Sequence, residues 1–110
     1  MQRERSKPTY DLNEAKWLAR CGMFTMNRRA RQFIANRYED KPENVIKALF
    51  DSTCKDDFRK SVALDIVPGS WADVYFIPYL GRVWYVKFFI QRDGNLRLNV
   101  LSANWDGYIH

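Results

Sequence analysis

The sequence predicts an α+β fold in which N-terminal helices pack on a C-terminal antiparallel β-meander. Up to about residue 63, apolar side chains recur at helical spacing between capping and breaking residues. From residue 73 onward, three aromatic-rich runs alternate with short turns, as strands joined by hairpins do. A length of 110 residues suits one domain. We therefore expect a polar arm (1–9), a single domain (10–104) and a C-terminal tail (105–110).

Most of the first half of the chain is expected to be helical. Asp11 and Glu14 match a capping box, in which each side chain satisfies an unpaired N–H group at the start of a helix. Gly22 supplies the stop. Asn27 caps a second helix with an apolar stripe. The expected elements are helices over about 12–21 and 28–37, a third helix that Asp40, Pro42 and Glu43 indicate, a short strand over 23–26 and a short helical piece over 55–63. The buried face of the third helix is expected to consist of Val45, Ile46, Leu49 and Phe50.

The second half is expected to form three strands, over 73–79, 82–91 and 96–102. Leu80-Gly81 and Asp93-Gly94 mark the turns between them. Side chains alternate along a strand, so neighbouring residues face opposite sides of the sheet. We assign Trp84, Val86, Phe88 and Ile90 to the core face, together with Leu96, Leu98 and Val100. The other face then carries Tyr85, Lys87 and Arg97.

Charge is unevenly distributed along the chain, whose formal net charge is +5. Residues 1–37 carry nine Lys and Arg against three Asp and Glu, residues 38–73 carry five against eight, and residues 74–110 carry four against two. A basic front and back suit a polyanionic partner such as RNA, because lysine and arginine neutralise phosphate while aromatic rings stack on unpaired bases. A solvated outer sheet face without a partner fits the same pattern.

Cysteine, histidine and hydropathy exclude several classes of protein. Cys21 and Cys54 do not form a CxxC pair, and the only histidine is His110, so we expect no metal site and two idle thiols in a reducing compartment. The first seven residues lack the apolar region of a signal peptide. No apolar run approaches the roughly 20 residues of a membrane helix. The expectation is a cytoplasmic protein that needs neither a membrane nor a cofactor.

The residue types favour one kind of RNA cleavage over two others. The acidic residues fall on predicted helix starts and loops, which is a weak basis for a metal-dependent nuclease. A single terminal histidine excludes a two-histidine mechanism. Metal-free attack by the 2′-hydroxyl of the RNA remains, with lysine or arginine stabilising the charged phosphorane and tyrosine or lysine moving protons. Lys60, Tyr85 and Lys87 are residue types that this chemistry could use.

Several segments together resemble a known family. They are Lys7-Pro8-Thr9-Tyr10-Asp11-Leu12, Asp57-Phe58-Arg59-Lys60-Ser61, Trp71-Ala72-Asp73-Val74-Tyr75, Tyr85-Val86-Lys87 and a hydrophobic strand ending in Ser102. Their order and spacing over about residues 7–103 resemble the MqsR family, the messenger-RNA-cleaving toxins of bacterial toxin–antitoxin pairs.

The resemblance implies a compact fold related to the RelE-type interferases. It implies metal-free endoribonuclease (hydrolase) activity on single-stranded mRNA at short GC-containing sites, and neutralisation by a cognate antitoxin. By their places in the motifs, Lys60 and Tyr85 would be catalytic. Lys87 and Arg97 would bind RNA in support, together with Tyr75 and Trp71.

Two departures from the family pattern leave alternatives open. Ala72 stands where the family has a catalytic glutamine, and no lysine follows Ser102. One transition-state contact is worth roughly a hundred- to thousand-fold in rate. The chain is therefore either an active RNA-cleaving toxin or a catalytically weakened toxin fold that binds and inhibits a host factor, encoded by a phage or other mobile element. A structural partner with an incidental basic surface is a third reading.

Overall fold

The structure is a computed structural model and describes residues 3–65 and 69–105. Within these residues it contains three α-helices, one 3-10 turn and a six-stranded sheet, which confirms the α+β class. In chain order the elements are β1 (Glu4–Arg5), α1 (Leu12–Arg20), β2 (Phe24–Met26), α2 (Arg28–Ala35), α3 (Pro42–Ser52), the turn η1 (Lys55–Asp57), β3 (Phe58–Ala63), β4 (Trp71–Tyr79), β5 (Arg82–Gln91) and β6 (Arg97–Trp105).

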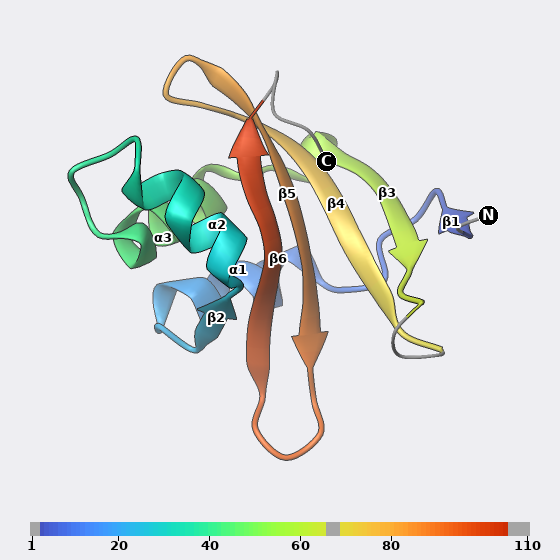
Figure 1. The fold of residues 1–110 in the computed structure, drawn as a ribbon. Coiled ribbons are helices and arrows are strands. Elements are labelled where there is room, and N and C mark those ends of the chain that lie inside the picture. Colours follow the sequence, from blue (N-terminus) through green and yellow to red (C-terminus); the bar gives the residue numbers. More distant parts are fainter. Residues whose placement is uncertain (1–2, 66–68, 106–110) are drawn as a thin grey trace.

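The strands form one mixed sheet in the order β1-β3-β4-β5-β6-β2 (Figure 1). The expected meander, β4 to β6, is its centre, and every neighbouring pair is antiparallel except β2 with β6. The sheet is therefore wider than expected. The strands β1 and β2 have only two and three residues and form the two edges, and β2 confirms the short strand expected over 23–26.

A two-residue turn joins β4 to β5 and fixes their register. Leu80 and Gly81 have φ angles of 51° and 73°, a pairing of left-handed residues typical of a type I′ hairpin turn. Tyr79 therefore pairs with Arg82, and the ladder runs back from there to Asp73 opposite Phe88. Leucine seldom adopts a positive φ, whereas glycine does so without steric cost.

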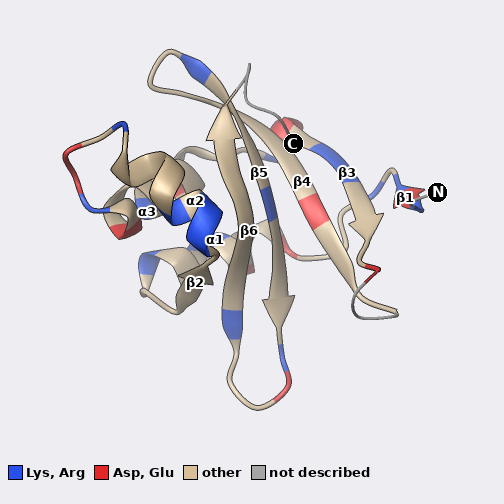
Figure 2. Cartoon of the chain, in the orientation of Figure 1, with Lys and Arg blue, Asp and Glu red and all other residues tan. Residues whose placement is uncertain are grey.

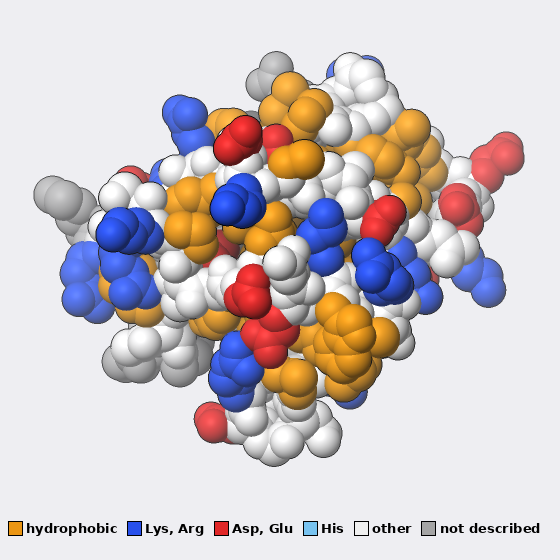
Figure 3. Space-filling view, turned by 180° about the vertical axis from the view of Figure 1, so that it is seen from behind, with side chains coloured by type: hydrophobic (Ala, Val, Ile, Leu, Met, Phe, Trp, Pro, Cys, Tyr) orange, Lys and Arg blue, Asp and Glu red, His pale blue; other side chains and the backbone are white. Residues whose placement is uncertain are grey.

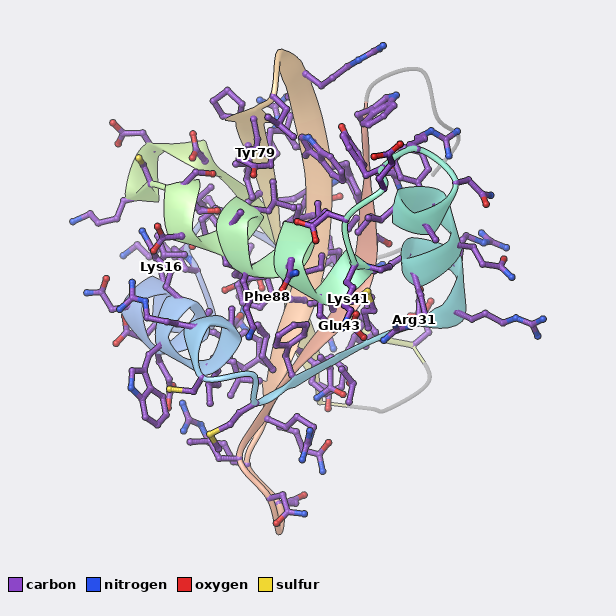
Figure 4. The ribbon with its side chains drawn as sticks, turned by 90° about the vertical axis from the view of Figure 1, so that its left-hand side faces the viewer. Lys16, Arg31, Lys41, Glu43, Tyr79 and Phe88 are labelled. Atoms are coloured by element: carbon purple, nitrogen blue, oxygen red, sulfur yellow. The ribbon has the colours of Figure 1, made fainter. Side chains whose placement is uncertain are left out.

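All three helices cover one face of the sheet, which we call the helix-covered face. The side chains of β5 that were assigned to the core are confirmed there, since Trp84, Val86, Phe88 and Ile90 are at most 4% exposed. They pack against apolar side chains of the helices in one continuous cluster. In Figure 4, α3 crosses in front of the strands, and Arg31 of α2 reaches Glu43 of α3 at 2.7 Å.

The helical piece expected over 55–63 is wrong. Only the turn η1 is helical, and β3 follows it directly. Phe58 and Val62 are four residues apart, a spacing that fits one face of a helix but also fits a strand. Pairing with β4 decides between the two, since β3 lies antiparallel beside it from Phe58 to Ala63.

A buried carboxylate ties the N-terminal arm to the sheet. Asp73 of β4 is fully buried on the helix-covered face. Its oxygens accept hydrogen bonds from the backbone N–H of Thr9 at 3.0 and 3.1 Å and from that of Tyr10 at 2.9 Å. These two N–H donors, one of them shared between both carboxylate oxygens, offset the cost of burying the charge. The polar arm is thus attached to the sheet by β1 and by Asp73.

The C-terminal tail begins later than expected. Trp105 is the last residue of β6, and its ring packs edge-on against Phe33 and Trp84, with centroids 4.8 and 5.3 Å away. The rest of the expected tail, 106–110, lies outside the described residues. Both cysteines are free thiols on the surface. None of the described helices is long and apolar enough to cross a membrane.

Candidate RNA-binding face

The face of the sheet opposite the helices, which we call the open face, carries the residues singled out by the sequence. Strand register places them in two adjacent rows across the sheet. One row runs Lys60, Val74, Lys87 and Ser102, and the next runs Phe76, Tyr85 and Asn104. Neighbouring strands are about 4.8 Å apart. Lys60 and Lys87 therefore lie on either side of Val74, with backbones roughly 10 Å apart.

A β-bulge in β3 brings two consecutive basic residues to the open face. Phe58 pairs with Tyr75 and Lys60 with Val74, so Arg59 is an extra residue without a partner in the ladder. A bulge breaks strict alternation and redirects side chains. Phe58 packs on Tyr75 on the helix-covered side, while both Arg59 and Lys60 reach the open face.

Lys60 lies between an acidic and an aromatic neighbour. Its Nζ atom donates to Glu4 Oε2 at 2.9 Å, and the two side chains are 38% and 50% exposed. Burial raises the pKa of Tyr85, the positive charge of Lys60 lowers it, and Glu4 raises it again. Burial is the largest of these effects, so the pKa of Tyr85 lies above the ordinary value of 10.0 and the hydroxyl group keeps its proton at neutral pH.

The third strand of the face completes the surroundings of Tyr85. Asn104 of β6 pairs directly with Tyr85, and Ser102 pairs with Lys87. A second bulge leaves Leu101 without a ladder partner, so that Leu101 joins Ser102 on the open side. Asn104 is 6% exposed. Its amide therefore lies beside the tyrosine that the sequence singled out.

The open face is not simply a wet polar surface, because it contains a small apolar cluster of its own. Val62, Ala72 and Val74 are at most 3% exposed. Partly buried side chains surround them, namely Leu64, Tyr85, Phe89 and Leu101. Ala72, the residue in place of the family's glutamine, thus has its methyl group inside a hydrophobic patch.

Two of the residues expected to bind RNA lie on the other face. Tyr75 alternates with Phe76 and points toward the helices, where it is 1% exposed and stacks on Phe88. Trp71 shares that side of β4 with Asp73 and lies under Arg5, whose guanidinium carbon is 3.6 Å from the ring centroid. Neither side chain lies with Lys60 and Tyr85, so the geometry of the open face gives no support to a role of Tyr75 or Trp71 in binding RNA.

Arg97 lies on the open face but away from the two rows. It pairs with Gln91, four residues along β5 from Lys87. Four residues of a strand span roughly 13 Å. The structure thus brings together Lys60, Tyr85 and Lys87, and it places Arg97 at the far end of the same surface.

Phe76 and Arg59 are the site residues that the sequence reasoning missed. A two-residue turn at Leu80-Gly81 pairs Tyr79 with Arg82, and counting back three residues on each side sets Phe76 opposite Tyr85. That signal was present in the sequence. The position of Arg59 could not be obtained in this way, because it depends on a bulge.

Charged residues of both signs lie on the strands of the sheet and on the molecular surface. Figure 2 shows basic positions in blue on β3, β5 and β6 and an acidic position in red on β4, which is Asp73 and points to the helix-covered face. Seen from behind, in Figure 3, basic, acidic and hydrophobic side chains are interspersed. That view shows no field of a single sign.

Metal-ligating residues do not gather in the described part of the chain, where no group of three His, Cys, Asp or Glu side chains could hold an ion.

No protein-family model matches the chain, and no curated protein is similar enough in sequence to count as a relative.

Proposed function

We propose that the protein is a divergent MqsR-type mRNA interferase with a RelE/MqsR-like fold, which cleaves single-stranded mRNA on its open face without a metal. One observation carries the proposal. Lys60, Tyr85 and Lys87, from two separate motifs, lie in adjacent rows on one face, and the positive charge of Lys60 acts on Tyr85, whose pKa burial nevertheless raises. The substrate places the activity in the cytoplasm, with a cognate antitoxin as the inhibitor.

The chemistry follows from the charge states of these groups. The 2′-hydroxyl of the RNA gives up its proton to solvent water as its oxygen attacks the adjacent phosphorus, the phosphorus–5′-oxygen bond breaks, the departing oxygen is protonated, and a 2′,3′-cyclic phosphate and a 5′-hydroxyl result. The phosphorane carries extra negative charge, which the ammonium groups of Lys60 and Lys87 stabilise. Tyr85 keeps its proton at neutral pH and so donates it, either to a phosphoryl oxygen or to the departing 5′-oxygen.

Glu4 must release Lys60 before that lysine can bind the phosphate of the RNA. Its ion pair with Lys60 is well exposed to solvent, and exposed pairs contribute about 0–1 kcal/mol. Phosphate, with more charge and more acceptor oxygens, can therefore replace the carboxylate at Lys60. The same pair orients the lysine side chain toward β1 before RNA arrives.

Cleavage of a long unstructured RNA in the presence of EDTA tests the proposal. Wild-type protein should cut the RNA and leave cyclic phosphate ends. Lys60→Ala should lower the rate by roughly 10²–10³-fold, the cost of losing one contact to the transition state. Lys47→Ala, at an exposed position on α3, is the matched control and should cut at the wild-type rate. If folded wild-type protein in large excess leaves the RNA intact, the nuclease proposal is wrong.

Ala72 favours a second candidate, a toxin fold that binds and inhibits a host protein. A methyl group buried in an apolar cluster supplies neither a proton nor a hydrogen bond where the family has a glutamine. On this reading, Lys60→Ala would leave growth inhibition by the expressed protein unchanged. Loss of inhibition by folded Lys60→Ala, with retention by Lys47→Ala, favours the nuclease.

A further inference from the structure

Phe76 is an exposed aromatic ring at the edge of the candidate site. It is 37% exposed, although the residues on either side of it in β4, Tyr75 and Ile77, are each 1% exposed. It lies directly opposite Tyr85 in the ladder, and the two ring centroids are 5.8 Å apart at a tilt of 52°. The pair presents two adjoining aromatic surfaces on the open face.

Arg59 lies beside this ring. The bulge in β3 directs its side chain toward β4, and its guanidinium carbon lies 5.1 Å from the centroid of Phe76. A guanidinium group over an aromatic ring is attracted by the ring's quadrupole and still has N–H groups for phosphate. Arg59 itself is exposed. The open face therefore offers a ring for a base next to a cation for its phosphate.

We infer that Phe76, with Arg59, forms a stacking subsite for one unpaired nucleobase of single-stranded RNA, next to the phosphate held by Lys60 and Lys87. This inference rests on the proposed function, because the subsite binds one nucleotide of the same RNA substrate. An unpaired base suits the subsite, since the ring is accessible and every base has an apolar face. The charges around it fit an anionic chain, with Arg59, Lys60 and Lys87 against Glu4.

The subsite holds a base without reading its identity. Stacking on an aromatic ring tolerates any base, whereas selection of a base requires hydrogen bonds to its edge. Purine stacks more extensively than pyrimidine on a ring of this size, so a modest preference for purine is expected at this nucleotide. The ring also fixes the sugar next to Tyr85, which helps orient the 2′-hydroxyl toward the phosphorus.

Binding of a non-cleavable RNA tests the inference separately from catalysis. The probe is a fluorescein-labelled single-stranded oligonucleotide whose 2′-hydroxyls are methylated, so that it cannot be cleaved by 2′-hydroxyl attack. Phe76→Ala should weaken binding roughly 5- to 150-fold, the range for loss of one base–aromatic stack. Phe76→Trp should restore it. Val83→Ala is the matched control, because Val83 is 49% exposed on the same hairpin and carries no ring.

A spectroscopic signal distinguishes stacking from general hydrophobic contact. A fluorescent adenine analogue placed in the probe loses emission when its base stacks on a ring. Quenching should disappear in Phe76→Leu, which keeps the apolar side chain. The dependence of affinity on salt should be unchanged in Phe76→Ala, whereas Lys87→Ala should lower the slope by about 0.7, the value for one phosphate contact on a single strand.

The outcomes separate the two proposals. If RNA binds but Phe76→Ala and Val83→Ala bind equally well, the stacking subsite is wrong and the proposed nuclease stands. If Phe76→Ala weakens binding while the wild-type protein does not cleave RNA, the subsite stands and the nuclease is wrong. Absence of any binding by folded wild-type protein overturns the subsite. Equal loss in Phe76→Ala and Phe76→Trp also contradicts it.

Discussion

The two faces of β4 and β5 have nearly opposite environments although their side chains alternate residue by residue. On the helix-covered face, Trp84 and Val86 are fully buried and join a core that includes all three helices. On the open face, Val83 is 49% exposed and Tyr85 is half-buried. The helix-covered face therefore forms the main core of the protein. The open face keeps only a small apolar cluster, and its remaining side chains are accessible to a substrate.

The largest expected difference between the faces is in stability. Trp84→Ala should lower the free energy of unfolding by about 3–5 kcal/mol, because it leaves a cavity and removes ring contacts to Phe33 and Trp105. Val83→Ala, one residue away, should change it by less than about 0.5 kcal/mol. Urea denaturation followed by circular dichroism measures both. Similar losses in the two variants would contradict the assignment of faces.

The next difference is in catalysis, between two tyrosines on opposite faces. Tyr85→Phe removes the proposed proton donor and should lower the cleavage rate by roughly 10²–10⁴-fold. Tyr75→Phe, on the helix-covered face, should leave the rate constant of the folded protein unchanged. Single-turnover cleavage of RNA measures this step directly. A greater loss of rate in Tyr75→Phe than in Tyr85→Phe would show that the catalytic face has been misassigned.

The smallest expected effect concerns alkaline pH. Burial, with help from Asp73, Asp11 and Asp57, raises the pKa of Tyr75 to about 12 from an ordinary value of 10.0. The folded protein then holds this proton more tightly than the unfolded chain does. Its contribution to stability is complete below about pH 10 and falls as pH rises from about 10 to about 12.

Urea midpoints at a series of alkaline pH values test this statement, with Tyr75→Phe as the comparison. The variant lacks the ionisable group, so its stability should fall less steeply between pH 10 and 12 than that of the wild type. Tyr85 also has a raised pKa and contributes in the same direction. Identical slopes for wild type and Tyr75→Phe would mean that the ring is not buried as described.

Much of the sheet could be predicted from the sequence because its strands alternate regularly. The predicted bounds of β5, 82–91, agree with the structure, and the two sides of that strand are confirmed. Regular alternation fails at a bulge. The extra residue Arg59 could not be placed on the open face, and neither could Leu101, because each position depends on pairing with a distant strand.

One wrong prediction and one that the geometry does not support have different physical sources. The spacing of Phe58 and Val62 fits a helix as well as a regular strand, and the bulge at Arg59 turns the two side chains to opposite faces of the sheet, so local spacing could not identify β3. The expected RNA contacts of Tyr75 and Trp71 rest on their motif rather than on alternation. The register pairs Tyr75 with Val86, a helix-covered position of β5, and Trp71 lies on the same side of β4, two residues before the last pair of the ladder, Asp73 with Phe88. In the candidate site, residue types were predictable and their neighbours were not.

The turn at Leu80 and Gly81 has a consequence for how this chain tolerates insertions. Its length of two residues determines which alternate side chains of β4 face the helices and which lie on the open face. A slip of one residue would turn Phe76 inward and Tyr75 outward, exchanging a ring for stacking with a ring of the core. Substitutions in this turn that keep two left-handed residues should therefore be accepted more readily than any change in its length. The length of this turn therefore determines which side chains of the hairpin lie on the open face.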